Sequence, residues 1–169
     1  MDYKIALDIG EECLRKVGPM VPATWMVTPE REAQLRMLGG NIPSPVRGHL
    51  LLDTGAGHLM IERYVAQQLK LTKLGKTRAY GIGGIDEFEQ YEAILLLPII
   101  PLTNPQPFPV SIGFPVKCPE SNLQEHHKEY RTPDGKPLRL IGVLGRTFLQ
   151  FTKVIYDGIN GKIEIHIDQ

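Results

Sequence analysis

Leu50-Leu51-Leu52-Asp53-Thr54-Gly55-Ala56 decides the fold of this chain, because it delivers a carboxylate at the end of an apolar strand that begins at Val46. An aspartate that follows buried aliphatic residues lies in a partly desolvated place. The hydroxyl of Thr54 can brace the carboxylate, and Gly55 lets the chain turn tightly and leave the carboxylate exposed. Taken alone, the same residues also form a common turn, because aspartate and glycine favour turns. The stretch therefore predicts either a reactive carboxylate or a plain turn.

The residues before this stretch predict a strand and a short helix. Met20 to Thr28 has the apolar content of a strand, interrupted by Pro22. Thr28-Pro29-Glu30-Arg31-Glu32 has the form of an N-cap followed by proline in the first helical turn. We expect this helix to end before Gly39-Gly40.

Residues 60 to 70, which follow the stretch, predict an amphipathic helix. Four apolar residues recur at helical spacing, and four polar residues are expected on the outside. The apolar residues are Ile61, Tyr64, Val65 and Leu69, and the polar residues are Glu62, Arg63, Gln67 and Lys70. We expect the apolar stripe to pack in the core rather than to form a binding face.

The middle of the chain predicts a hairpin followed by an irregular region. Ala79 to Leu97 has the pattern of two strands hinged near Gly81-Ile82-Gly83-Gly84, where glycine permits a positive φ and keeps the tip mobile. Nine of the fourteen prolines fall between Pro98 and Pro137. Proline and turn signals at this density predict the least regular part of the chain.

The C-terminal segment returns to clear periodicity. Leu138 to Leu144 is apolar, and Gly145-Arg146-Thr147-Phe148-Leu149 has the form of a short helix start. Val154-Ile155-Tyr156 and Lys162 to Ile167 flank Asp157-Gly158-Ile159-Asn160-Gly161. Two strands around such a turn sequence predict a hairpin.

In this order of elements the chain resembles the retropepsin-like aspartic proteases, the single-domain retroviral type and its bacterial relatives. The family's order is an apolar strand that runs into Asp-Thr-Gly-Ala, a helix, a glycine-tipped flap, and then two apolar residues and a glycine before a short helix and a closing hairpin. Val143-Leu144-Gly145-Arg146-Thr147-Phe148-Leu149 resembles the second signature of the family. Two ordered signatures about ninety residues apart are far more specific than one.

The resemblance implies an all-β dominated fold, a single-domain retropepsin-like acid protease barrel with one or two short helices over residues 1–169. Relative to a minimal retroviral protease the chain has insertions around 28–45 and 98–137, which is more typical of the bacterial branch. One residue of the implied site differs from the family pattern. Retroviral members usually carry an acidic residue directly after Asp-Thr-Gly-Ala, where it pairs with the arginine of the second signature, whereas this chain has Gly57. Arg146 therefore lacks that expected partner.

The function that the resemblance implies is an aspartic endopeptidase acting on a peptide or protein substrate, with no cofactor. Its chemistry needs two carboxylates, and the chain has one Asp-Thr-Gly and no internal repeat, so a homodimer would supply the second. The catalytic residues implied are Asp53, Thr54 and Gly55. The substrate-binding residues implied are Ala56, Gly57, Tyr80, Gly81, Ile82, Gly83 and Gly84. The alternatives are a non-catalytic dimerisation or peptide-binding module with the same fold, and an enzyme that stays silent until its monomers are assembled.

Length and composition limit the other possibilities. A chain of 169 residues is expected to form one domain. Its 19 Lys and Arg balance 19 Asp and Glu, with no block of like charge, so nucleic acid is not an expected partner. The longest apolar run, Ala93 to Leu102, is broken by Pro98 and is too short to cross a membrane. The N-terminal residues lack the pattern of a secretory signal, so we expect a cytoplasmic protein. Cys13 and Cys118 match no metal-ligand or redox spacing, so we expect two reduced thiols.

Three other motifs lack a required part. Gly75-Lys76-Thr77 resembles the end of a phosphate-binding loop, but Lys70 stands where the first glycine is needed. His126-His127 lacks the four-residue offset of two metal ligands on a helix, so we expect no metal site. Ser111 lacks the spacing of a nucleophile elbow.

Overall fold

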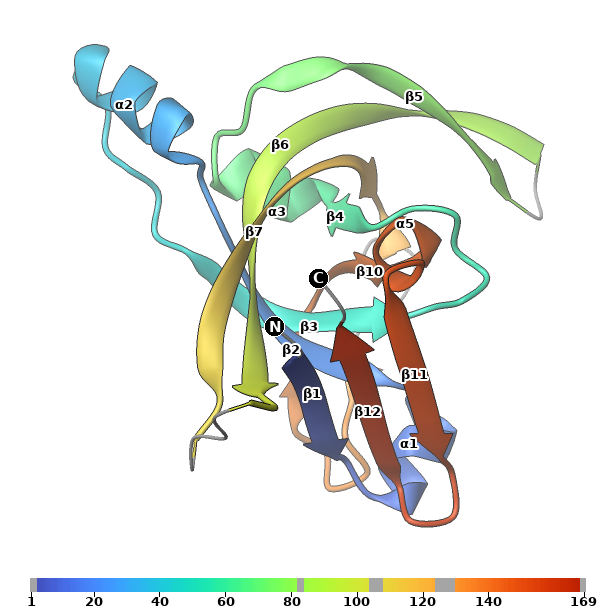
Figure 1. Ribbon diagram of the computed structural model, residues 1–169. Helices are drawn as coiled ribbons and strands as arrows, with labels where there is room; N and C mark the ends of the chain where they lie inside the picture. The colour runs from blue at the N-terminus through green and yellow to red at the C-terminus, as the bar shows by residue number, and fades with distance from the viewer. Residues whose placement is uncertain (1–2, 82–83, 104–107, 124–129, 168–169) are drawn as a thin grey trace.

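The computed structural model describes residues 3–81, 84–103, 108–123 and 130–167, and its chain is mostly β-strand (Figure 1). The elements of the described residues follow in chain order: β1 Tyr3–Asp8, α1 Glu11–Lys16, β2 Met20–Met26, α2 Pro29–Met37, β3 Val46–Leu52, β4 Met60–Glu62, α3 Arg63–Gln68, β5 Lys73–Gly81, β6 Gly84–Pro101, β7 Val110–Ser121, β8 Tyr130–Arg131, β9 Pro137–Leu138, β10 Leu140–Leu144, α5 Arg146–Leu149, β11 Thr152–Asp157 and β12 Lys162–Ile167.

Six strands close into a barrel. Each strand pairs with the next in the order β6, β2, β3, β10, β4, β7, and β7 pairs again with β6. Its interior is apolar and includes Trp25, Leu50, Ile61 and Leu95, all fully buried. The Trp25 indole Nε1 donates to the carbonyl oxygen of Ile141 over 3.0 Å, so the largest core side chain also has its polar atom paired. The prediction of an all-β dominated barrel is confirmed at this level.

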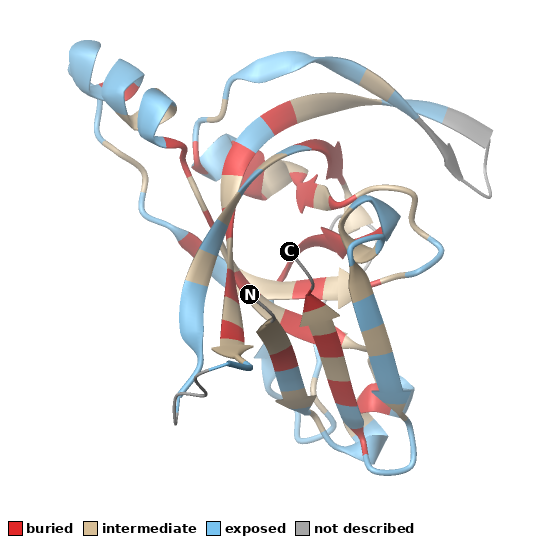
Figure 2. Ribbon diagram, viewed as in Figure 1, coloured by how far each residue is buried: buried red, intermediate tan, exposed pale blue. Residues whose placement is uncertain are grey.

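The sheet continues beyond the barrel at the ends of the chain. β1 pairs with β6 on one side and with β12 on the other, and β11 pairs with β12. Ile5 on β1 and Ile163, Ile165 and Ile167 on β12 are buried and join the core of the barrel. Figure 2 shows this contrast, with buried residues along β12 and a mixture of exposed and intermediate residues along β11. The terminal strands are therefore internal to the sheet, and β11 is its last strand.

Several predicted elements are found where the sequence placed them. β2 includes Pro22, β3 ends at Leu52 as expected, and β11 and β12 form the predicted hairpin. Thr28 caps α2, since its side-chain oxygen accepts from the backbone N of Arg31 over 3.2 Å. β5 and β6 form the predicted hairpin, and its residues 82–83 lie outside the described part. α2, in the 28–45 insertion, stands away from the barrel in Figure 1.

Residues 60 to 70 differ from the prediction. Met60–Glu62 is the strand β4, because Ile61 pairs with Gly142 of β10 and with Glu120 of β7, and the helix starts only at Arg63. Glu62, predicted to be outside, is 1% exposed. The described residues also contain four helices, one of them α1, so the prediction of one or two is wrong. None of these helices is long and apolar enough to span a membrane.

The prediction of an irregular region from Pro98 to Pro137 is wrong where β6 and β7 run through it, and its residues 104–107 and 124–129 lie outside the described part. β6 runs on to Pro101, and β7 pairs with it from Val110 opposite Ile99 to Pro119 opposite Gln90. β6 and β7 pair with each other along one edge. At Pro98 of β6 and Pro115 of β7, the opposite edge of the strand has no partner strand among the described residues. The missing N–H of a proline can face such an edge without loss of a ladder hydrogen bond.

Candidate active site at the Asp53 loop

Parallel pairing of β3 and β10 brings the two sequence signatures together. Leu52 lies opposite Leu144, and the backbone N of Asp53 donates to the carbonyl oxygen of Leu144 over 3.3 Å. All five residues of β10 are buried. Because parallel strands end at the same edge of a sheet, Asp53 and Arg146, 93 positions apart in sequence, leave the barrel side by side.

The loop from Asp53 to Gly57, called the Asp53 loop below, holds its carboxylate in a tight turn. The backbone N of Gly55 donates to Oδ1 of Asp53 over 2.7 Å, and the N of Ala56 donates to the Asp53 carbonyl oxygen over 3.2 Å. Asp53 is half-buried, while Thr54 and Gly55 are exposed. This geometry alone is that of an Asx turn, so the case for a site depends on what surrounds the loop.

The start of α5 clamps the Asp53 loop through main-chain and side-chain hydrogen bonds. The N of Arg146 donates to the carbonyl of Ala56 over 2.9 Å, and the N of Thr147 donates to that of Gly57 over 3.2 Å. The hydroxyl of Thr147 accepts from the N of Leu59 over 2.7 Å. A plain turn does not need this second segment, so the arrangement indicates that the position of Asp53 is fixed by the fold.

Gly145 makes the close approach of the two segments possible. A Cβ at this position would lie 2.1 Å from the carbonyl oxygen of His58 and 2.9 Å from that of Ala56. These atoms belong to the backbone and cannot move aside easily. Glycine is therefore the residue that fits where the second signature meets the Asp53 loop.

Arg146 binds backbone carbonyl oxygens of the Asp53 loop, although residue 57 is a glycine and not the acidic residue expected there. Its Nη1 donates to the carbonyl oxygens of Thr54 over 3.0 Å and Gly55 over 2.9 Å. A Cβ at residue 57 would lie 3.7 Å from Nη2 of Arg146, so the guanidinium occupies the space beside that glycine. The arginine thus holds the backbone of the loop directly instead of through a carboxylate.

The remaining predicted site residues lie on a different element. Tyr80 and Gly81 end β5, Gly84 begins β6, and Ile82 and Gly83 lie outside the described residues. The ladder of the hairpin runs to Gly81 opposite Gly84. In Figure 1, β5 and β6 arch over the barrel, and the end of β5 reaches the side of the molecule on which the loop between β3 and β4 also lies. The structure therefore gathers Asp53, Thr54, Gly55, Ala56 and Gly57 in one loop and leaves the hairpin residues separate from it.

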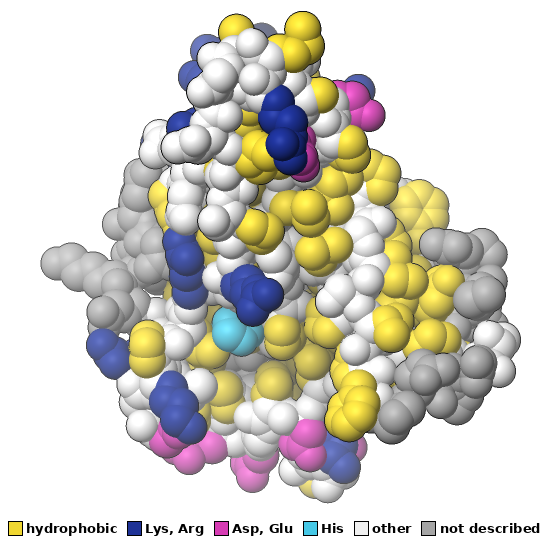
Figure 3. Space-filling model, turned by 90° about the vertical axis from the view of Figure 1, so that its left-hand side faces the viewer, with side chains coloured by type: hydrophobic (Ala, Val, Ile, Leu, Met, Phe, Trp, Pro, Cys, Tyr) yellow, Lys and Arg dark blue, Asp and Glu magenta, His cyan; other side chains and the backbone are white. Residues whose placement is uncertain are grey.

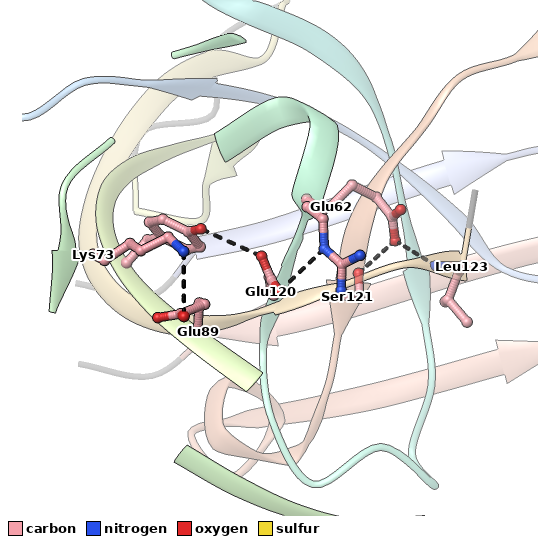
Figure 4. Close-up of polar contacts among 8 residues, drawn as sticks. Glu62, Lys73, Glu89, Glu120, Ser121 and Leu123 are labelled. Carbon is pink, nitrogen blue, oxygen red and sulfur yellow. Dashed lines mark hydrogen bonds and ion pairs between the residues drawn. The ribbon is translucent and has the colours of Figure 1, made fainter. Parts of the chain in front are cut away.

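The sequence reasoning missed a buried polar cluster at the seam between β4 and β7 (Figure 4). Glu62 accepts from the hydroxyl of Ser121 and from the backbone N of Leu123, the latter over 3.2 Å. Beside it, Glu120 accepts from Nε of Arg63 over 3.1 Å and from the hydroxyl of Tyr91 over 3.3 Å. The contact between Glu62 and Ser121 joins β4 to β7, and the contacts of Glu120 join β7 to α3 and β6.

The polar seam is a structural device, because each carboxylate in it is occupied by donors of the chain. Burial, with a smaller contribution from Glu120, raises the pKa of Tyr91 to about 12. The strands share two residue pairs, Ile61 with Glu120 and Glu62 with Ser121, so side-chain bonds add to a short ladder. No periodicity in the sequence indicated this cluster, since Glu62 fits the polar face of the helix predicted there.

Two cavities are lined by residues outside the Asp53 loop. One, of about 360 Å³, is mainly apolar and lies beside α5, between Phe148, Phe114, Phe151 and Ile167. The other, of about 410 Å³, lies on the outside of β2, β3, β6 and β7 and is lined by Arg47, His49 and Ser111 among others. Figure 3 shows the side of the molecule that carries β6 and β7, where exposed apolar side chains surround a few cationic ones and a histidine.

The structure also places the other residues singled out as reactive. Cys13 and Cys118 are free thiols, and burial raises the pKa of Cys118 to about 12, which makes it a poor nucleophile. Among the described residues no three metal-ligating side chains lie together, and His126 and His127 are outside that part of the chain. Neither protein-family models nor curated proteins match this sequence. The Asp53 loop is the candidate site that combines an accessible carboxylate with a rigid support.

Proposed function

We propose that this chain is a retropepsin-like aspartic endopeptidase that works as a homodimer. The observation that carries the proposal is the clamp between the two signatures, in which Gly145, Arg146 and Thr147 hold the Asp53 loop at the ends of two paired strands. Asp53 is half-buried and its neighbour Thr54 is exposed, so a second copy can approach the loop from the side of Thr54.

The chemistry follows from two carboxylates that share one proton. In the proposed dimer, the ionised Asp53 takes a proton from water while the protonated Asp53 of the partner subunit donates to the scissile carbonyl oxygen. The water oxygen bonds to the carbonyl carbon and forms a tetrahedral intermediate. The proton taken up by Asp53 then passes to the amide nitrogen and the C–N bond breaks. As the amine leaves, one hydroxyl of the intermediate gives its proton to the carboxylate of the partner subunit and the carbonyl group forms again, so the pair ends with one shared proton. Thr54 and Gly55 hold the geometry of the loop.

The β5–β6 hairpin supplies the cover in this proposal. Tyr80 and Gly81 at the end of β5 and Gly84 at the start of β6 would lie over an extended substrate and exclude water from the reacting atoms. Ala56 and Gly57 would line the floor below it. The setting we propose is the cytoplasm, where Cys13 and Cys118 remain reduced.

The absence of an acidic partner for Arg146 at residue 57 would favour the alternative, a non-catalytic module in which Asp53 lies in an ordinary turn. That argument loses force because the guanidinium binds Thr54 and Gly55 directly. The test is incubation of the protein with a peptide library and detection of new termini by mass spectrometry. We expect cleavage by wild type and by Asp8→Asn, an exposed aspartate at the end of β1, and none by Asp53→Asn. Equal cleavage by Asp53→Asn would refute the assignment.

A further inference from the structure

We infer that the cavity on the outer face of β2, β3, β6 and β7 binds a small monocarboxylic acid with an apolar body. This cavity, called the Arg47 cavity below, has a volume of about 410 Å³. The side chains that define it are Thr24, Arg47, His49, Leu96, Pro98 and Ser111. None of the described residues that line it belongs to the Asp53 loop or to the end of the β5–β6 hairpin, so the inference goes beyond the proposed function and does not depend on it.

Strand pairing places the side chains of the Arg47 cavity on one face of the sheet. Two residues that lie opposite each other in paired strands share a face, and so do residues two apart on one strand. Thr24 lies opposite both Arg47 and Leu96, and Pro98 lies opposite Ser111. The alternate residues of these strands are buried in the barrel, so the cavity lies on its outer surface.

The polar side chains of the Arg47 cavity are not used by the fold. Among the described residues, no hydrogen bond or ion pair is made by the guanidinium of Arg47 or by the hydroxyls of Thr24 and Ser111. The described residues that line the cavity include no acidic side chain. A guanidinium and two hydroxyl groups that are free to donate, with no carboxylate among them, favour an anion.

His49 adds a neutral donor to the same cavity. Its Nδ1 is buried and has no hydrogen-bond partner among the described residues, whereas its Nε2 is not buried in this way. An unpaired acceptor in the interior is tolerated better than an unpaired N–H, so we assign the proton of the neutral ring to Nε2. Burial also lowers the pKa of His49, which keeps the ring uncharged near neutral pH. The imidazole therefore offers an N–H to a ligand without adding a positive charge.

Charge and lining together select a monocarboxylate over phosphate. With His49 neutral, Arg47 is the one cation among the described residues that line the cavity, so it balances a single negative charge. A guanidinium matches the two oxygens of a carboxylate through parallel N–H···O bonds. The half-buried side chains of Leu96 and Pro98 offer an apolar wall to the rest of the ligand. Figure 3 shows this combination, a histidine and cationic side chains among apolar ones. A phosphate dianion would leave one charge unbalanced and the apolar wall in water.

The first test compares ligands on the unchanged protein. The full chain is titrated with hexanoate, benzoate, hexanamide and inorganic phosphate near neutral pH, and binding is followed through the backbone amide signals in NMR spectra. At least one of the two carboxylates should bind saturably, and hexanamide and phosphate should bind about tenfold more weakly or not at all. The signals that move should belong to residues 22–24, 47–49, 96–98 and 111. Saturable binding of neither carboxylate, equal binding of hexanoate and hexanamide, equal or tighter binding of phosphate, or shifts centred elsewhere would each overturn the inference.

The second test removes the cation. Arg47→Gln should weaken binding of the carboxylate by about tenfold or more, because the guanidinium supplies the only positive charge among the described lining residues. Arg15→Gln, at an exposed arginine of α1, is the matched control and should bind like wild type. Arg47 makes no contact that the fold needs, so urea unfolding should give both variants the stability of wild type. Wild-type affinity of Arg47→Gln, or an equal loss of affinity in Arg15→Gln, would overturn the inference. Peptide hydrolysis is not a readout here, so the result stands apart from the test of the protease.

Discussion

Nη1 of Arg146 donates to the carbonyl oxygen of Gly55 over 2.9 Å, so the second signature of the sequence holds the main chain of the first. A second bond from the same atom reaches Thr54 over 3.0 Å. The arginine thus fixes two consecutive peptide groups next to Asp53, and we assign it a positioning role. The variants below test this and other parts of the account.

Arg146→Lys should lower kcat by about tenfold or more while KM changes little, because an ammonium on a flexible stem cannot hold both carbonyls in the same way. The free energy of unfolding should fall by no more than about 1–2 kcal/mol, since the guanidinium is exposed to water. Peptide hydrolysis and urea unfolding measure the two effects. Arg36→Lys, on α2, is the control. A loss of stability without a loss of kcat would show that Arg146 serves the fold only.

Gly145→Ala should destabilise the protein by about 3 kcal/mol or more, because the new Cβ would meet the backbone carbonyls of His58 and Ala56. Gly57→Ala is the matched control, since its nearest neighbour is Nη2 of Arg146 at 3.7 Å, an ordinary contact. Thermal unfolding of both variants measures the difference. Equal melting temperatures would show that the two segments separate more easily than the structure indicates.

Glu62→Ala should lower the free energy of unfolding by about 1–3 kcal/mol, because it leaves the buried donors of Ser121 and Leu123 without an acceptor. Glu92→Ala, at an exposed position of β6, should change stability little. Urea unfolding of the two variants compares them. Equal stability of both would mean that the polar seam does not help to close the barrel.

Stability should fall as the pH decreases below about 6.5, the ordinary pKa of histidine. Burial lowers the pKa of His49, whose Nδ1 has no hydrogen-bond partner among the described residues. The unfolded chain therefore binds a proton at a higher pH than the folded one, and stability is lost between the two pKa values as the pH decreases. Urea unfolding of wild type and His49→Gln, at pH values from about 5 to about 8, measures how the free energy of unfolding depends on pH. His49→Gln should lose less stability over this range, and an unchanged pH dependence would contradict the assignment to His49.

Local chemistry explains which elements could be predicted from the sequence. β3, the Thr28 cap of α2 and the β11–β12 hairpin are encoded by neighbouring residues, and all three are found as expected. β4 and β7 could not be predicted this way, because long-range pairing overrides a helical pattern at Ile61 and outweighs the prolines of β7. Likewise, Asp53 could be predicted as a candidate site residue from its motif. The contact of Arg146 with Gly55 could not, because it depends on the parallel pairing of β3 and β10, which no local pattern specifies.

Mixing subunits tests most directly whether two Asp53 carboxylates form one site. Wild type and Asp53→Asn are combined in equal amounts, allowed to exchange subunits, and assayed for peptide hydrolysis at a concentration where the dimer is populated. If both carboxylates are needed, random pairing leaves wild-type homodimers as about a quarter of all dimers, and activity per total protein falls to about a quarter of the wild-type value. Activity of about half the wild-type value would show that each Asp53 acts alone and would contradict the account.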